Sequence, residues 1–312
     1  MPLIFNGVTI PENVANAFTF NGVDITQVFF NNASIWLQNL IPITTTGMFY
    51  TGSVYPTYSN RVTRINASGV LIGSETNVGT ARHLSAGAGL GTTGVFYGGL
   101  SALNKVSTIY NRVTRINASG VLIGSETNVG TARYGLAGAG LGTTGVFYGG
   151  FISNTYSNSV IRINNSGVLI GSETNVGTAR YLSAGAGLGT TGVFYGGFVY
   201  PTIFNRVTRI NDSGVLIGSE TNVGTARHYL AGAGLGTTGM FYGGSSPYNR
   251  VTRINNSGTL IGSETNVGTA RFALAGAGLG TTGVFYNGVV TRINDSGTLI
   301  GSETNVGTAR NY

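Results

Sequence analysis

The fold of this chain is decided by the stretch GSETNVGTAR, which occupies residues 73–82 and occurs five more times. Its glutamate stands at positions 75, 126, 173, 220, 264 and 303, so successive copies are 51, 47, 47, 44 and 39 residues apart. Two other motifs keep the same period, because AGAGLG occurs five times and TTG(V/M)FY six times. Self-similarity at such a period is typical of an architecture built from one repeated unit.

Each repeat offers four short strands. In the repeat that follows Arg82 we expect strands over residues 85–90, 95–99 and 112–116, and a fourth that begins at residue 121. Turn-forming residues separate the strands at 91–94 and at 117–120. Four antiparallel strands per repeat predict one blade of a β-propeller, and six such sets predict six blades. The first strand is almost all glycine and alanine, because innermost strands converge on the axis and leave no room for larger side chains.

The composition agrees with an all-β protein. Charged residues make up 9% of the chain, against about 25% in ordinary soluble domains. Glycine accounts for 52 of the 312 residues, and cysteine is missing, which excludes a disulfide framework, a thiolate metal site and a cysteine nucleophile. No apolar run approaches the length that spans a bilayer, and the first residues lack the basic region of a signal peptide.

The order of motifs resembles the kelch repeat of β-propellers. Most repeats place an arginine before a small apolar strand, then Phe-Tyr-Gly-Gly, then Arg-Val-x-Arg-Ile-Asn, as in residues 96–99 and 112–117. The paired glycine weakens to Thr51-Gly52 in the first repeat and to Asn287-Gly288 in the last. The outer strand departs from the kelch pattern, since leucine and isoleucine stand where kelch repeats carry tryptophan. The resemblance covers residues 45–312 and implies a six-bladed kelch-like propeller of four-stranded blades. It implies little about function, because propellers serve many functions.

The first repeat has no AGAGLG segment before Thr45. We therefore expect Asn39–Ile43 to take the innermost position of the first blade, where a proline is tolerated at a free strand edge.

Residues 1–44 contain no repeat and are predicted to form three β-hairpins, around Asn6-Gly7, Asn21-Gly22 and Asn31-Asn32. A segment of this size seldom folds alone, so we expect it to dock on a partner or to trimerise. Residues 20–36 resemble short N-terminal modules of tailed-phage virion proteins, which implies other virion proteins as partners. The aromatic side chains expected to make this contact are Phe5, Phe18, Phe20, Phe29, Phe30 and Trp36.

The repeats differ from one another mainly at two places. One is the segment between the second and third strands of a blade, and the other is the link from the fourth strand to the next blade. Antiparallel order brings both to one face of the propeller, and aromatic-rich variable loops on a rigid scaffold favour a binding surface. Neutral drift of loops after duplication is the alternative. The candidate ligand-binding residues are Tyr55, Tyr58, His83, Tyr110, Tyr134, Tyr156, Tyr181, Tyr200, Phe204, His228, Tyr229, Tyr248 and Phe272.

One arginine recurs at the end of every repeat. The net charge is +7, and the repeats carry +9 because residues 1–44 contribute only Glu12 and Asp24. A ring of arginines could attract sialic acid, uronic acid or lipopolysaccharide phosphate. The alternative is that each arginine ties its blade to the next through Glu75, Glu126 and their equivalents. These candidate anion-binding residues are Arg82, Arg133, Arg180, Arg227, Arg271 and Arg310.

Nothing in the sequence favours catalysis, a metal or a cofactor. Gly89–Gly94 matches G-x-G-x-x-G, but it leads into a strand and not into a helix. We therefore interpret it as a turn between two strands and not as a nucleotide-binding loop. His83 and His228 are three blades apart, too far to share a metal. Six of the ten carboxylates occupy one repeated position, which indicates a structural role and gives no support for a paired-carboxylate glycosidase site.

The expected function is therefore that of a non-enzymatic phage virion protein, of the tail fibre or spike type, exposed on the particle surface. It would recognise a host surface glycan or protein through the variable face, as a homo-oligomer with a trimer favoured. A purely structural virion protein, such as a decoration, collar or fibre segment, is the first alternative. A polyanion or DNA clamp is the second, and we expect neither nucleic-acid binding nor membrane insertion.

Overall fold

The computed structural model describes residues 3–5, 8–10, 19–20, 23–24, 27–30, 33–36, 46–54, 57–103, 106–246 and 248–312. The chain divides into two compact units, Met1–Ile43 and Thr44–Tyr312. All regular structure in the described residues is β-strand, and no helix among them is long and apolar enough to cross a membrane.

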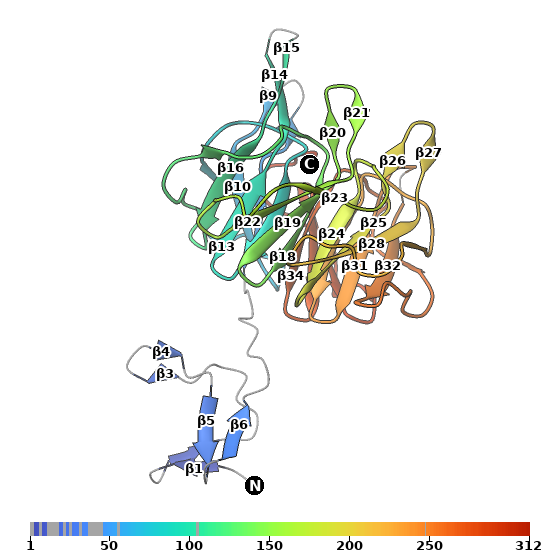
Figure 1. Cartoon of the computed structure of the whole chain (residues 1–312). Helices are drawn as coiled ribbons and strands as arrows, with labels where there is room; N and C mark the ends of the chain where they lie inside the picture. The colour runs from blue at the N-terminus through green and yellow to red at the C-terminus, as the bar shows by residue number, and fades with distance from the viewer. Residues whose placement is uncertain are drawn as a thin grey trace. The chain divides into compact units, whose positions relative to one another are not determined.

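The second unit is a six-bladed β-propeller, whose antiparallel sheets stand side by side in a ring (Figure 1). Five blades have four strands, and the first blade has three among the described residues. The innermost strands are β12 (Ala86–Leu90), β18 (Ala137–Leu141), β24 (Ala184–Leu188), β30 (Ala231–Leu235) and β34 (Ala275–Leu279). The second strands are β7 (Thr46–Tyr50), β13 (Thr93–Tyr97), β19 (Thr144–Tyr148), β25 (Thr191–Tyr195), β31 (Thr238–Tyr242) and β35 (Thr282–Tyr286).

The outer half of each blade is a longer third strand and a two-residue fourth strand. The third strands are β10 (Arg61–Asn66), β16 (Arg112–Asn117), β22 (Ser159–Asn164), β28 (Arg206–Asn211), β32 (Arg250–Asn255) and β36 (Val289–Asn294). The fourth strands are β11 (Thr76–Asn77), β17 (Thr127–Asn128), β23 (Thr174–Asn175), β29 (Thr221–Asn222), β33 (Thr265–Asn266) and β37 (Thr304–Asn305).

The predicted position of the fourth strand is wrong. Residues 121–123 form only a narrow turn against the third strand, with an isolated bridge between Ile116 and Leu122. Gly124 then has a φ of +64°, which ends the extended conformation. The strand that pairs with β16 is therefore Thr127–Asn128, opposite Arg112 and Val113.

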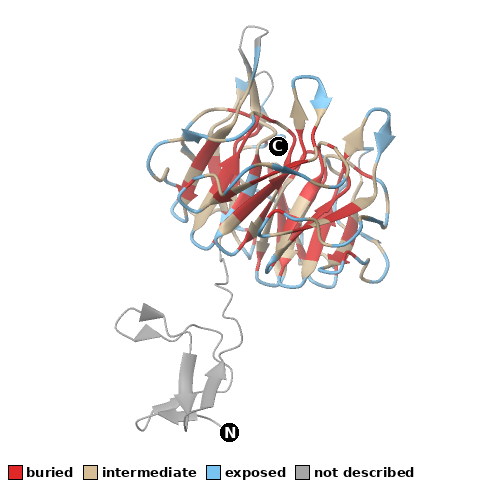
Figure 2. Cartoon of the chain, in the orientation of Figure 1, coloured by how far each residue is buried: buried red, intermediate tan, exposed pale blue. Residues whose placement is uncertain are grey.

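The hydrophobic core lies between the blades, because each sheet is covered on both faces by its neighbours. Tyr195 of the fourth blade and Phe241 of the fifth are both fully buried, and their ring centroids are 5.2 Å apart. The same tyrosine–phenylalanine contact recurs at the other seams at 5.0 to 5.5 Å. Figure 2 shows this burial along the strands of each blade.

The expectation that only small residues fit near the axis is confirmed. A Cβ placed on Gly187 of β24 would lie 2.0 Å from the carbonyl oxygen of Gly140 in β18. A Cβ on Gly185 would lie 2.4 Å from the carbonyl oxygen of Gly138. Neighbouring inner strands therefore approach each other backbone to backbone. The expected inner strand Asn39–Ile43 of the first blade lies outside the described residues.

Four additional hairpins rise from one face of the propeller, between the second and third strands of blades one to four (Figure 1). In Figure 2 the tips of the hairpins of blades three and four have the colour of exposed residues. Antiparallel bridges join His83 to Leu100, Tyr134 to Phe151 and Tyr181 to Phe198, so these three links between blades each lie beside a hairpin. The prediction that both variable segments share one face is confirmed. The hairpins are β8–β9 (Ser53–Val54, Thr57–Tyr58), β14–β15 (Leu100–Leu103, Val106–Ile109), β20–β21 (Phe151–Ile152, Thr155–Tyr156) and β26–β27 (Phe198–Val199, Thr202–Ile203).

The first unit consists of three two-stranded hairpins in its described residues, as predicted. Of the aromatic residues expected to dock on a partner, Phe18 lies outside the described residues. The other five, Phe5, Phe20, Phe29, Phe30 and Trp36, lie on these hairpin strands. The hairpins are β1–β2 (Leu3–Phe5, Val8–Ile10), β3–β4 (Thr19–Phe20, Val23–Asp24) and β5–β6 (Gln27–Phe30, Ala33–Trp36).

Candidate functional site

A continuous series of aromatic rings crosses the hairpin face of the propeller. We call these nine residues the aromatic band. They come from the hairpins of blades three and four and from the links that join blades two to six. Ring centroids of successive members are 5.1 to 6.4 Å apart. The band consists of Tyr134, Phe151, Tyr156, Tyr181, Phe198, Tyr200, His228, Tyr229 and Phe272.

The centre of the band is half-buried and its ends are open. Tyr181 contacts Phe151, Tyr156 and Phe198 with centroid distances of 5.7, 5.5 and 5.8 Å. Tyr200 is 78% exposed and Phe272 is 48% exposed. A contiguous series of apolar rings that remains accessible at the surface is typical of a binding surface.

The tyrosine hydroxyls of the band lie close enough to influence one another. Burial, together with the neighbouring hydroxyls of Tyr229, Tyr156 and Tyr134, raises the pKa of Tyr181 to about 12. Burial also raises the pKa of Tyr229 and of Tyr134. These hydroxyls therefore remain neutral at physiological pH, where each can both donate and accept a hydrogen bond. The band combines apolar ring faces with a group of polar tips.

The two histidines are packed as aromatic rings. His228 stacks on Phe198 at 5.1 Å, and its Nδ1 lies 2.7 Å from Ser245 Oγ. His83 stacks on Tyr58 at 4.8 Å, with its Nδ1 3.1 Å from the carbonyl oxygen of Leu100. Burial lowers the pKa of both, so both rings are neutral at pH 7. In the described part of the chain, no three histidine, aspartate or glutamate side chains gather as a metal would require.

The other candidate residues lie on this face beside the band. Three of them carry an arginine over the ring, with the guanidinium carbon 5.5 Å from Tyr110, 5.5 Å from Phe204 and 5.9 Å from Tyr248. Tyr110 also hydrogen-bonds Ser101 at 2.9 Å. Tyr55 lies outside the described residues.

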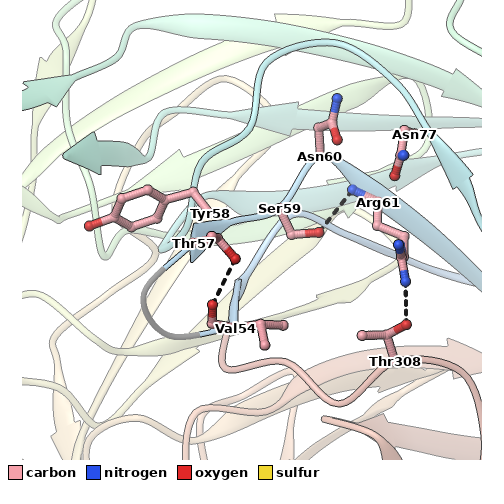
Figure 3. A pocket seen from close by; sticks show the side chains of 8 residues that line it. All are labelled: Val54, Thr57, Tyr58, Ser59, Asn60, Arg61, Asn77 and Thr308. Atoms are coloured by element: carbon pink, nitrogen blue, oxygen red, sulfur yellow. Dashed lines mark hydrogen bonds between the residues drawn. The ribbon is translucent and has the colours of Figure 1, made fainter. Parts of the chain in front are cut away.

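A shallow pocket of about 340 Å³ lies between the first blade and the end of the sixth (Figure 3). The Nη1 of Arg61 donates to Thr308 Oγ1 and lies 3.2 Å from Glu75 Oε2, so the charge in this pocket is already paired. Its other described lining residues supply hydroxyls, amides and one valine, and none is a carboxylate or a histidine. They are Val54, Thr57, Tyr58, Ser59, Asn60 and Asn77.

The six repeated arginines do not form a surface ring. Arg180 is fully buried, donates from Nη1 to Glu220 Oε1 at 3.1 Å and lies over the Tyr148 ring at 5.1 Å. Every one of these arginines pairs with the glutamate of the next blade, and their side chains are at most 10% exposed. The prediction that these arginines are open to an anionic ligand is therefore wrong, and the alternative that they tie neighbouring blades together is confirmed. The pairs are Arg82–Glu126, Arg133–Glu173, Arg180–Glu220, Arg227–Glu264, Arg271–Glu303 and Arg310–Glu75.

The last of these pairs closes the ring. Arg310 of the sixth blade pairs with Glu75 of the first at 3.9 Å, and the backbone of Asn311 bridges to Ser53. The arginine–glutamate pair of the other seams is therefore also present between the chain's last and first blades.

The glutamates of the seams make stability depend on pH. Burial of Glu220 works to raise its pKa, but hydrogen bonds from Thr178 and Thr208 and the charge of Arg180 outweigh it and lower the pKa. The pKa is also lowered at Glu75, Glu126, Glu264 and Glu303. A folded pKa below the unfolded value of about 4.3 gives stability that is present above that pH and lost as the pH falls through the folded pKa.

We therefore expect the Tm of the propeller to fall steeply below about pH 4.3, as followed by circular dichroism from pH 7 to pH 2. The variant Glu220→Gln is expected to have a lower Tm at pH 7 and a smaller further loss in acid. A parent Tm that stays constant down to pH 2 would contradict this origin of stability.

Two residues of the aromatic band were not among the sequence-based candidates. Phe151 and Phe198 each follow the paired glycines that end the second strand, and each pairs with a link tyrosine. Their position directly after Gly-Gly in two repeats was a usable signal, because that position begins every hairpin.

Comparison with known proteins does not add to this description. The sequence matches no protein-family model and no curated protein.

Proposed function

We propose that this chain is a non-enzymatic binding protein that recognises a glycan through the aromatic band. The observation that carries the proposal is the series of nine rings in mutual contact on the one face where the repeats differ. Tyrosine supplies a large contact area at a low cost in conformational entropy and keeps a polar tip. A sugar has a similar character, since apolar C–H faces alternate with hydroxyls. The neutral hydroxyls around Tyr181 are suited to hydrogen-bond with the hydroxyls of a sugar.

The resemblance of residues 20–36 to phage modules, and the near-identical repeats that follow a small docking segment, support a setting on a phage particle. In that setting residues 1–44 attach the protein to other virion proteins, and the propeller presents its hairpin face to a host surface. Several copies in one homo-oligomer would raise the overall avidity even when each site binds weakly.

The test is binding of the purified full chain to an array of glycans and lipopolysaccharides. We expect the parent to bind a glycan and the variants Tyr200→Ala and Tyr181→Ala to lose at least about tenfold in affinity, which corresponds to about 1.4 kcal/mol. Tyr200 is largely exposed, so its truncation leaves the fold intact even if Tyr181→Ala is less stable. The matched control is Tyr248→Ala, which removes a tyrosine of the same face outside the band and should leave affinity within about twofold.

Two outcomes would count against the proposal. If no glycan binds, the protein is better explained as a structural virion component. If binding weakens by orders of magnitude as salt rises, the ligand is a polyanion held by charge, and the aromatic band is not the principal contact.

A further inference from the structure

Each third strand of the propeller carries an arginine at its fourth residue that forms no ion pair in the described residues. The ten ion pairs found there use other arginines, and all of them share the six repeated glutamates. Six of the ten carboxylates of the chain are thereby taken, and the four that remain are too few for six arginines. We call these residues the wall arginines: Arg64, Arg115, Arg162, Arg209, Arg253 and Arg292.

Each wall arginine is held between two glycines. A Cβ on Gly120 of the next blade would lie 3.1 Å from Arg64 Nε, and a Cβ on Gly73 of the same blade would lie 2.9 Å from its Nη2. At the equivalent glycines of all six copies the nearest arginine atom would lie 2.8 to 3.2 Å away. The wall arginines are nevertheless partly exposed. Their side chains are therefore placed in advance, which lowers the entropic cost of binding a ligand.

The wall arginines lie on the outer half of the blades. Each third strand starts at the hairpin face and ends in a turn at the opposite face, as β10 does between Arg61 and Asn66. The fourth residue of the strand is closer to that turn than to the hairpins. The wall arginines therefore belong to a surface that shares no residue with the aromatic band.

Two of the six seams already carry a carboxylate beside the wall arginine. Arg162 lies against Gly214, and Arg253 lies against Gly297. The turns that contain these glycines also contain Asp212 and Asp295, both of which are exposed. Arg253 in addition donates from Nη1 to the carbonyl oxygen of Asp295 at 3.4 Å. These two seams are therefore less attractive to an anion than the others.

Three consecutive seams carry no such carboxylate. They join blade six to blade one, blade one to blade two, and blade two to blade three. The turn residues 66–69, 117–120 and 164–167 are Asn-Ala-Ser-Gly or Asn-Asn-Ser-Gly, and the valine that follows each turn is 54 to 56% exposed. We call this surface the basic stretch. It consists of Arg292, Arg64 and Arg115 with Val70, Val121 and Val168.

We propose that the basic stretch binds a linear acidic polysaccharide of the polyuronate type, whose carboxylates pair with the three arginines. A guanidinium binds a carboxylate through two parallel N–H···O hydrogen bonds. The exposed valines offer apolar contacts to the C–H groups of the sugar rings, and exposed serines such as Ser119 offer hydroxyls to the sugar hydroxyls. The site goes beyond the glycan recognition proposed for the aromatic band, since it lies on a separate surface.

The shape and composition of the surface favour this ligand over other polyanions. The outer wall of a ring of blades is convex (Figure 1), so a flexible chain can reach three consecutive seams, whereas a globular acidic protein would reach fewer. Segments 66–74, 117–125 and 164–172 contain no aromatic residue on which the bases of single-stranded nucleic acid could stack. Duplex DNA, with a persistence length of about 150 base pairs, is too stiff to follow so small a ring.

The test is isothermal titration calorimetry of the full chain with an oligogalacturonate at low salt. We expect the parent to bind it, and to bind the methyl-esterified form of the same oligosaccharide at least about tenfold more weakly. The informative variant is Ala118→Asp, which copies the aspartate of the turns at Asp212 and Asp295 into the turn that Arg64 contacts. It should lose at least about tenfold in affinity and keep the parental Tm, because the same turn already tolerates aspartate in two blades.

Matched substitutions separate the basic stretch from general charge attraction. Arg64→Gln should weaken oligogalacturonate binding by at least about fivefold, whereas Arg253→Gln, which removes the same charge beside Asp295, should change it by less than about twofold. Tyr200→Ala should leave oligogalacturonate binding unchanged. Conversely, Ala118→Asp should leave unchanged any binding of a glycan that depends on Tyr200, so the two proposals can fail separately.

Four results would overturn the proposal. The first is failure of the oligogalacturonate to bind the parent at millimolar concentration. The second is an equal loss in Arg64→Gln and Arg253→Gln, which would indicate attraction by net charge alone. The third is a loss in Tyr200→Ala, which would place the oligosaccharide on the aromatic band. The fourth is binding of oligodeoxythymidine that is as tight and equally sensitive to Ala118→Asp, which would assign the basic stretch to nucleic acid.

Discussion

Replacement of Gly187 by alanine is expected to destabilise the propeller by about 3 kcal/mol or more, at the upper end of what overpacking costs. The new methyl carbon would lie 2.0 Å from the carbonyl oxygen of Gly140. The oxygen belongs to the backbone and the Cβ is bonded directly to it, and both strands are held by pairing, so neither atom can turn away as the end of a flexible side chain would. Relief requires inner strands to separate, and that disturbs the packing of two blades.

The measurement is urea unfolding followed by circular dichroism, with Gly89→Ala as the matched control. Gly89 is the equivalent residue of β12, and an added Cβ meets no described atom within 4 Å. Its substitution should change the unfolding free energy by less than about 0.5 kcal/mol, as is usual away from packed sites. Equal effects of the two substitutions would show that close approach of the inner strands is not what excludes larger residues.

The second large effect is expected from Arg180→Met. This substitution should lower the free energy of unfolding by about 3–5 kcal/mol, because it leaves a partly buried carboxylate without its buried partner. Glu220 is 14% exposed in its side chain and lies 3.1 Å from the Arg180 guanidinium. Methionine retains most of the apolar stem but supplies neither the charge nor the hydrogen bond to Thr208.

The control for Arg180 is Arg206→Met, since Arg206 faces the same glutamate from the solvent side. The Arg206 side chain is 31% exposed, and its Nη1 lies 3.7 Å from Glu220 Oε2. Its replacement should therefore lower the free energy of unfolding by no more than about 1 kcal/mol. If Arg180→Met does not fold, the double variant with Glu220→Gln should recover folded protein, because the unpaired charge is then removed. Similar losses in Arg180→Met and Arg206→Met would refute the view that burial decides the strength of these pairs.

Most of the propeller could be predicted from the sequence because its strands are fixed by local chemistry repeated in every blade. Asn117 is an example: its Oδ1 accepts hydrogen bonds from the backbone N–H groups of Ser119 and Val121, as the turn residues indicated. The fourth strand was misplaced because residues 121–123 have strand-like composition, while the glycine conformation that ends them is not evident from composition. The expected inner strand of the first blade remains a prediction.

The candidate site was only partly accessible to sequence reasoning. Antiparallel order sufficed to place Tyr134 and Tyr181 on one face, but contact between rings depends on the path of hairpins whose lengths differ from blade to blade. For the six arginines, the sequence identified the residues but did not decide their role. Their repetition identified them at once and favoured a structural pairing with the repeated glutamates, but it did not exclude a surface ring. The contact between Arg180 and Glu220 of the next blade decides between the surface ring and the seam.

The uniformity of the seams has a consequence for how such a chain changes over time. Because every blade offers the same arginine on one side and the same glutamate on the other, no blade encodes the identity of its neighbour. Unequal recombination could therefore delete or duplicate a whole blade without creating a mismatched junction. The number of blades in a closed ring is then set by the curvature that glycine-to-glycine contact allows at the axis. Each hairpin can be exchanged between blades as a separate module.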